Sequence, residues 1–150
     1  MSDNGKRVLI VDDKEIIRTT TALVLAEMGY STRTAEDGFS ALRAIHEECP
    51  DILLSDLSMP GMSGFELLMV VRRKFPTIHV IAMSGSFYGN DVPPGVLADA
   101  FHQKGSSLSA LLQAFRSLPL VTRRASEPSK TERRPGFSRM EATLSLTDAA

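Results

Sequence analysis

Two short apolar runs in this chain, VLIV and ILLS, each lead into aspartate, and this arrangement strongly restricts the fold. The first run is followed by Asp12 and Asp13, and the second by Asp56. Continuous apolar runs are typical of parallel strands that are buried on both faces. Ligand sites of open α/β sheets lie at the carboxyl ends of the strands, so the three carboxylates are expected to form one pocket. Such a cluster needs a cation, which suggests a divalent metal and phosphate chemistry.

Strand-like and helix-like segments alternate along the first 118 residues. Apolar periodicity predicts strands at residues 8–11, 31–35, 52–54, 78–83 and 100–103. It predicts helices at residues 14–28, 39–48, 63–75 and 107–118, the third opened by a Ser63–Glu66 capping box. Between the last two strands, Pro93 and Pro94 disfavour a helix interior, so a loop or single turn is expected there. The alternation predicts a parallel sheet with helices on both faces and right-handed crossovers.

Helical spacing also predicts which side chains of the first and last helices face the core. The expected inner residues are Ile17, Thr21, Val24 and Met28 in the first helix, and Leu108, Leu111, Leu112, Phe115 and Leu118 in the last.

The composition changes after residue 118. Residues 1–118 contain 11 basic and 14 acidic residues, whereas residues 119–150 contain 6 and 4 and are rich in Pro, Ser, Thr and Arg. We therefore predict one domain over 1–118 and a flexible, polar and basic tail over 119–150. The overall net charge of −1 gives no global indication of nucleic-acid or membrane binding.

Other bulk features suggest a cytoplasmic protein. Cys49 is the single cysteine, so no intramolecular disulfide can form, which fits a reducing compartment. No apolar run approaches the roughly 20 residues of a membrane span. The first residues, MSDNGKR, lack the apolar core of a secretory signal.

Each candidate residue has a structural alternative when it is taken alone. Asp13 could cap the following helix, and Asp56 could be a turn residue. Ser84 is a hydroxyl at a strand end, Lys104 could be a solvated surface cation, and Phe101 could be core. The combination is more specific, because a carboxylate can act as a nucleophile toward phosphorus when a metal and a lysine screen its charge. The three histidines show no metal-ligand spacing.

From about residue 6 to residue 118 the chain resembles the receiver domain of bacterial two-component response regulators. The resemblance rests on the order and spacing of VLIVDD, PDILLSDLSMPGMSGFELL, IAMSG and AFHQKG. It implies a flavodoxin-like, doubly wound, five-stranded parallel sheet in the order 2-1-3-4-5, here with an irregular or shortened fourth helix.

The resemblance also implies a role for each site residue. Asp56 corresponds to the phosphoacceptor. Mg²⁺ (or Mn²⁺) would be held by Asp13 directly, by Asp12 through water, by Asp56 and by the main-chain carbonyl of Ser58. Ser84 and Lys104 correspond to the residues that contact the phosphoryl oxygens. Phe101 corresponds to the aromatic switch residue. The partners implied are a histidine kinase or histidine phosphotransfer protein and an unidentified downstream protein. The sequence itself shows no second folded domain after residue 118 and no membrane span, so no DNA-binding domain and no membrane partner are expected. Whether the chain forms a homodimer stays open.

Two departures from the family pattern concern the output side of the domain. Gly105 stands where the family commonly has proline, often after a cis bond; a cis bond without proline costs about 2.5–4 kcal/mol, so a trans or altered loop is expected. Pro93 and Pro94 interrupt the fourth crossover, so a remodelled output surface is expected.

The leading interpretation is a stand-alone receiver that signals through phosphorylation-dependent protein contacts and is no enzyme beyond its own phosphorylation and dephosphorylation. A binding module without phosphorylation is the first alternative; Asp12, Asp13, Asp56, Ser84 and Lys104 all argue against it. A Mg²⁺-dependent phosphatase with an aspartyl nucleophile is the second. Such enzymes usually carry a further Asp two positions after the nucleophile, where this chain has Ser58.

Overall fold

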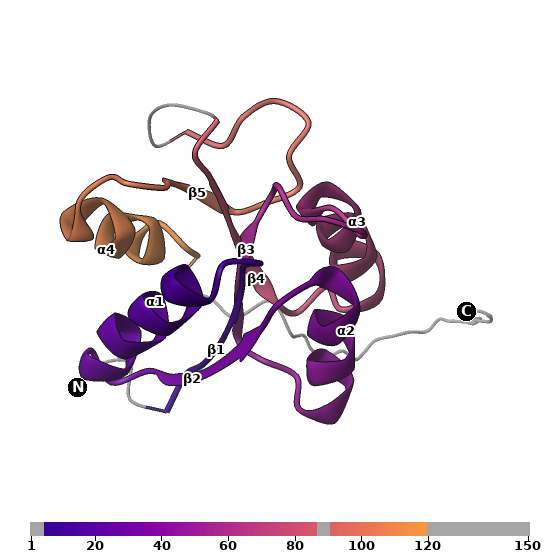
Figure 1. Ribbon diagram of the computed structural model, residues 1–150, viewed down its shortest axis with the longest axis horizontal. Helices are drawn as coiled ribbons and strands as arrows, with labels where there is room; N and C mark the ends of the chain where they lie inside the picture. Colours follow the sequence, from indigo (N-terminus) through magenta and orange to yellow (C-terminus); the bar gives the residue numbers. More distant parts are fainter. Residues whose placement is uncertain (1–4, 87–90, 120–150) are drawn as a thin grey trace, which may run out of the picture. The chain divides into compact units, whose positions relative to one another are not determined.

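The fold is a five-stranded parallel sheet with helices on both faces (Figure 1). The computed structural model describes residues 5–86 and 91–119. Its elements, in chain order, are β1 (Arg7–Val11), α1 (Glu15–Glu27), β2 (Ser31–Ala35), α2 (Gly38–Glu47), β3 (Ile52–Asp56), α3 (Gly64–Lys74), β4 (His79–Ser84), β5 (Ala100–Gln103) and α4 (Leu108–Arg116). The strand order β2-β1-β3-β4-β5 confirms the predicted topology. The predicted tail, apart from Pro119, lies outside the described residues.

The sheet separates two apolar cores because successive side chains of a strand point to opposite faces. α2 and α3 cover one face, and α1 and α4 cover the other (Figure 1). In β5, Phe101 belongs to the core cluster on the α2 and α3 face, whereas its neighbour Ala100 belongs to the opposite cluster. The three central strands β1, β3 and β4 are almost wholly buried, as their apolar sequences predict.

Local sequence signals determine where two of the helices begin. At α3, the Glu66 N–H donates to Ser63 Oγ at 3.2 Å, and the Ser63 N–H donates to Glu66 Oε1 at 3.0 Å. This reciprocal pair confirms the predicted capping box. At α2, Asp37 and Ser40 form an equivalent capping box that the sequence pattern did not reveal.

The predicted inner faces are correct for most helical positions and wrong for two. Leu111, Phe115 and Leu118 are buried in the α4 core, as expected. Met28 and Leu108 are instead exposed, and Leu25 is the buried residue of α1. α1 carries apolar residues on more than one side, so periodicity alone does not fix its rotation.

The crossover between β4 and β5 contains no helix in its described part, residues 85–86 and 91–99; residues 87–90 lie outside the described part. A tight turn occurs at residues 93–96, where the Val96 N–H donates to the Pro93 carbonyl oxygen at 3.2 Å. Pro94 and Gly95, with φ of +83° at Gly95, occupy the central positions expected of a type II turn. Val96 is buried in the same cluster as Phe101, so the turn covers part of the face that a helix would otherwise cover.

Aspartate side chains align the start of two strands. The Asp99 N–H donates to the Val80 carbonyl at 2.8 Å, and Asp99 Oδ2 accepts from the Val80 N–H at 2.8 Å. Asp51 makes the same pair of contacts with Arg7 before β3. Asp99 Oδ1 also pairs with the Arg72 guanidinium at 2.9 Å, which connects the crossover to α3.

No helix in residues 5–86 and 91–119 has the length and apolar character needed to cross a membrane.

We predict that Asp99→Ala lowers the free energy of unfolding by about 1–3 kcal/mol, because it leaves the Val80 N–H without its side-chain acceptor and removes the ion pair to the Arg72 guanidinium. Urea denaturation of wild type, Asp99→Ala and the exposed control Asp91→Ala measures this. The control should stay within about 0.5 kcal/mol of wild type. Equal stability of the two variants would contradict the assigned role of Asp99.

A second prediction concerns His102, which is buried opposite Met83 in the β4–β5 register. Burial lowers the pKa of His102, so the folded protein favours the neutral ring. In the unfolded chain His102 takes up a proton near pH 6.5, whereas in the folded protein it does so only at a lower pH. Protonation of the unfolded chain therefore lowers the free energy of unfolding as the pH falls from about 6.5 toward the folded pKa, and has no such effect above that range. The loss has a slope of at most about 1.4 kcal/mol per pH unit.

Urea denaturation of wild type and His102→Leu at pH 7.5, 6.5 and 5.5 tests this prediction. The variant should lose less stability than wild type on acidification, while the other two histidines contribute equally to both proteins. Parallel pH profiles would show that the burial of His102 does not affect acid stability.

Candidate functional site

The carboxyl ends of four strands meet at one edge of the sheet and bring the predicted site residues together. Asp12 follows β1, Asp56 ends β3, Ser84 ends β4 and Lys104 follows β5. The Lys104 N–H donates to the Ser84 carbonyl oxygen at 2.9 Å, which extends the β4–β5 pairing into the site. Parallel register therefore places two acids, a hydroxyl and an amine from distant parts of the sequence at the same level.

Lys104 connects two buried carboxylates. Its Nζ lies 2.8 Å from Asp12 Oδ2 and 3.1 Å from Asp56 Oδ2. Asp12 is fully buried and Asp56 is 2% exposed. The other oxygens are also held, because Asp12 Oδ1 accepts from the Lys14 N–H at 2.9 Å and Asp56 Oδ1 accepts from the Ser58 N–H at 3.2 Å. These contacts fix the orientation of both carboxylates.

The pKa shifts show how strongly the site depends on positive charge. Burial raises the pKa of Asp56, and the nearby charge of Asp12 raises it further, whereas the Ser58 N–H and Lys104 act in the opposite direction. For Lys104, burial by itself would lower the pKa, but the hydrogen bond to Asp12 and the charge of Asp56 outweigh it, so the pKa is raised. Lys104 thus remains charged, yet one lysine does not fully offset the burial of Asp56.

The donor set fits a divalent cation. One oxygen from each of Asp12, Asp13 and Asp56 lies within 4.8 Å of the others. Asp13 Oδ1 is buried and has no hydrogen-bond partner among the described residues, and the Lys14 ammonium lies 3.8 Å from Asp13 Oδ2. Asp13 is not the helix cap, because the N-cap position of α1 is Lys14 and no side chain caps that end. A hard cation with oxygen ligands, such as Mg²⁺ or Mn²⁺, would satisfy the unpaired oxygen.

The remaining predicted residues occupy the expected positions, and their roles stay predictions. Ser84 is 1% exposed, and its Oγ accepts from the Ser86 N–H at 3.0 Å. Ser58 adjoins Asp56 through its main-chain N–H. Phe101 is 1% exposed and faces the core cluster that includes Val96. An inward Phe101 fits both a plain core residue and one conformation of a switch.

Two further residues position the site, and the sequence analysis missed them. The Arg18 guanidinium donates to the Asp12 carbonyl oxygen at 2.9 Å, which ties α1 to the end of β1. Gly64 begins α3, and a Cβ there would lie only 2.0 Å from the Asp56 carbonyl oxygen and 2.5 Å from Leu57 Cα. The only indication in the sequence was that Gly64 directly follows the Ser63 cap. That position alone does not reveal the close approach to Asp56.

Comparison with known proteins identifies the family. The family model of the response regulator receiver domain matches residues 8–115. The chain is 40% identical over 77 residues to the DNA-binding transcriptional regulator NtrC of Escherichia coli strain K12, covering 51% of the chain and 16% of NtrC. It is 35% identical over 85 residues to the sensor histidine kinase RcsC of Salmonella typhimurium, covering 57% of the chain and 9% of RcsC. The chain therefore spans less than a fifth of these relatives.

Solved structures agree with this assignment. The chemotaxis protein CheY4 of Vibrio cholerae aligns with a TM-score of 0.68 at 27% identity, covering 77% of this chain and 99% of CheY4. The response regulator TrrA of Thermotoga maritima, in complex with Mg²⁺ and BeF, aligns with a TM-score of 0.67 at 30% identity, covering 74% and 96%. This chain belongs to the response regulator receiver domain family, whose members accept a phosphoryl group from histidine kinases.

We predict that Gly64→Ala destabilises the protein by about 1–3 kcal/mol, because the added methyl group must displace the main chain at Asp56. The matched control is Gly85→Ala, where a Cβ would meet nothing within 4 Å. The control should change the free energy of unfolding by less than about 1 kcal/mol. Urea denaturation compares the two variants, and equal effects would refute the crowding argument.

Proposed function

We propose that this receiver domain accepts a phosphoryl group on Asp56, that transfer requires Mg²⁺ or Mn²⁺, and that the donor is a histidine kinase or histidine phosphotransfer protein. The observation that carries the proposal is the position of Asp56: a buried carboxylate that shares Lys104 with Asp12 and lies in a three-carboxylate cluster containing an unpaired oxygen. Phosphoryl transfer depends mainly on positioning and charge neutralisation, and this arrangement suits both.

In the transfer, an oxygen of Asp56 forms a bond to phosphorus as the bond between phosphorus and the donor imidazole nitrogen breaks. The imidazole keeps the electron pair of the broken bond and takes up a proton. A bound Mg²⁺ would supply positive charge next to the reacting groups. Its proposed oxygen ligands are Asp12, Asp13, Asp56 and the Ser58 carbonyl. Lys104 and the Ser84 hydroxyl are the proposed contacts to the phosphoryl oxygens.

Two solved structures that contain one relative, TrrA, support the choice of cofactor and donor. TrrA of Thermotoga maritima was solved in complex with Mg²⁺ and BeF. A second structure contains TrrA with the histidine kinase ThkA, and its TrrA chain aligns with this chain at 29% identity and a TM-score of 0.67. The same chemistry in this chain would make it a phosphoprotein without catalytic turnover.

The proposed output is a phosphorylation-dependent contact with a downstream protein, made by the crossover between β4 and β5. The packing supports this location, because Val96 of the crossover and Phe101 of β5 share one core cluster. Phe101 lies three residues before Lys104 in the chain. A movement of Lys104 toward a phosphoryl group could therefore displace Phe101 and, through their shared core cluster, Val96 of the crossover. The described part of the crossover forms a turn and no helix. A partner protein would therefore bind a surface of different shape from that of a helix.

We predict that a small phosphodonor such as acetyl phosphate labels wild type in the presence of Mg²⁺, and that Asp56→Asn removes the label by removing the nucleophile. Intact-protein mass spectrometry under conditions that preserve acyl phosphates measures the label. Removing the divalent ion with EDTA should also prevent labelling.

The matched control is Asp91→Asn, which alters an exposed aspartate of the crossover and should label like wild type. Equal labelling of Asp56→Asn and wild type would sink the assignment. Labelling that is unaffected by EDTA would instead remove the metal requirement, while sustained turnover of a small phosphate ester would favour a phosphatase.

A further inference from the structure

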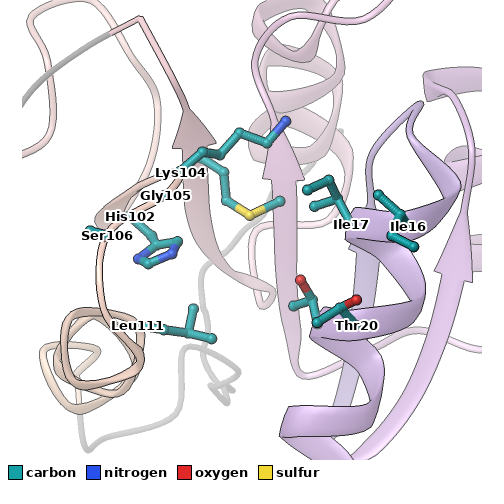
Figure 2. Close-up of a pocket in the computed structure, with 10 residues that line it drawn as sticks. Ile16, Ile17, Thr20, His102, Lys104, Gly105, Ser106 and Leu111 are labelled. Atoms are coloured by element: carbon teal, nitrogen blue, oxygen red, sulfur yellow. The ribbon is translucent and has the colours of Figure 1, made fainter.

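A small cavity lies on the α1 and α4 side of the sheet and borders the carboxylate cluster at Lys104 (Figure 2). Its volume is about 280 Å³. Its walls come from the first half of α1, the end of β4, β5 and the loop and helix that follow. An engineered apolar cavity of about 150 Å³ binds benzene, so this one can hold a single ring with a small substituent.

The cavity is mainly apolar, and His102 is the one polar residue of its lining that is buried. Ile17 and Thr20 of α1 face His102 of β5 and Leu111 of α4 across it (Figure 2). Met83, whose thioether interacts favourably with aromatic rings, forms part of the wall. The lining therefore suits an apolar ring better than a charged or sugar-like ligand.

His102 supplies a hydrogen-bonding group that the fold does not use. The residue is 91% buried, and its Nδ1 has no hydrogen-bond partner among the described residues. A buried polar atom without a partner destabilises the folded protein. A neutral imidazole has one donor and one acceptor nitrogen, and a hydroxyl that reaches the ring can pair with it in either tautomer.

Gly105 is one of the residues that line the cavity. Its φ is +87°, which proline cannot adopt, and a Cβ at this position would meet nothing within 4 Å. Glycine at this position therefore permits a loop conformation that the family's common proline would not allow.

We propose that this cavity binds a small hydroxylated aromatic molecule, of the phenol class, whose hydroxyl group pairs with His102. The ring occupies the apolar space between Ile17, Met83 and Leu111. This proposal does not depend on phosphorylation of Asp56. It does link the two sites, because Lys104 both lines the cavity and contacts Asp12 and Asp56.

The test compares two probes of the same shape, 4-ethylphenol and ethylbenzene, with the full chain. Two-dimensional NMR titration should give saturable shifts at the cavity residues, and 4-ethylphenol should bind about twofold to tenfold more tightly, as one neutral hydrogen bond allows. His102→Leu should remove that preference while ethylbenzene still binds. Its fold is checked by its amide spectrum.

A second pair of variants tests the location. Thr20→Trp adds an indole at the cavity and should abolish binding of both probes. Thr19→Trp is the matched control, since Thr19 is exposed on the same helix and does not line the cavity, and it should bind both probes like wild type. The proposal is overturned if neither probe gives saturable shifts, if His102→Leu keeps the preference for 4-ethylphenol, or if Thr20→Trp binds like Thr19→Trp.

Discussion

The contact of Lys104 with two buried carboxylates is the interaction on which the site depends. Asp12 and Asp56 come from adjacent strands, and because both are buried they would repel each other strongly if no cation lay near. Lys104 reduces this repulsion without removing the effect of burial, since the pKa of Asp56 stays raised. One lysine therefore leaves the cluster short of positive charge, and a further cation would stabilise it.

The sheet supplies the geometry for that contact through its register. Five parallel strands end at one edge, so residues separated by tens of positions in the chain meet there. Asp51 and Asp99 help to hold the register at the opposite end, where their side chains accept main-chain N–H groups of the neighbouring strand. Aspartates therefore act at both ends of the sheet. Asp51 and Asp99 bind main-chain N–H groups where strands begin, and Asp12 and Asp56 bind Lys104 where strands end.

The fold and most of the site could be predicted from sequence, because their signals are local. The apolar runs and the Ser63–Glu66 capping box each act over a few residues, and strand order followed from the family resemblance. The features that were missed depend on tertiary packing. α1 is apolar on several sides, so its buried residue Leu25 was not distinguishable from Met28. Arg18 and the cavity beside His102 depend on how α1 sits against the sheet, which no local pattern encodes.

The crowding at Gly64 has a mechanical consequence. The first residue of α3 lies so near the Asp56 carbonyl oxygen that no side-chain atom fits between them, and the Gly64 N–H also donates to the Leu57 carbonyl at 3.1 Å. Contacts between main chains cannot be relieved by a change of rotamer. The start of α3 and the main chain at Asp56 therefore behave as one rigid joint, and a displacement of either is passed directly to the other.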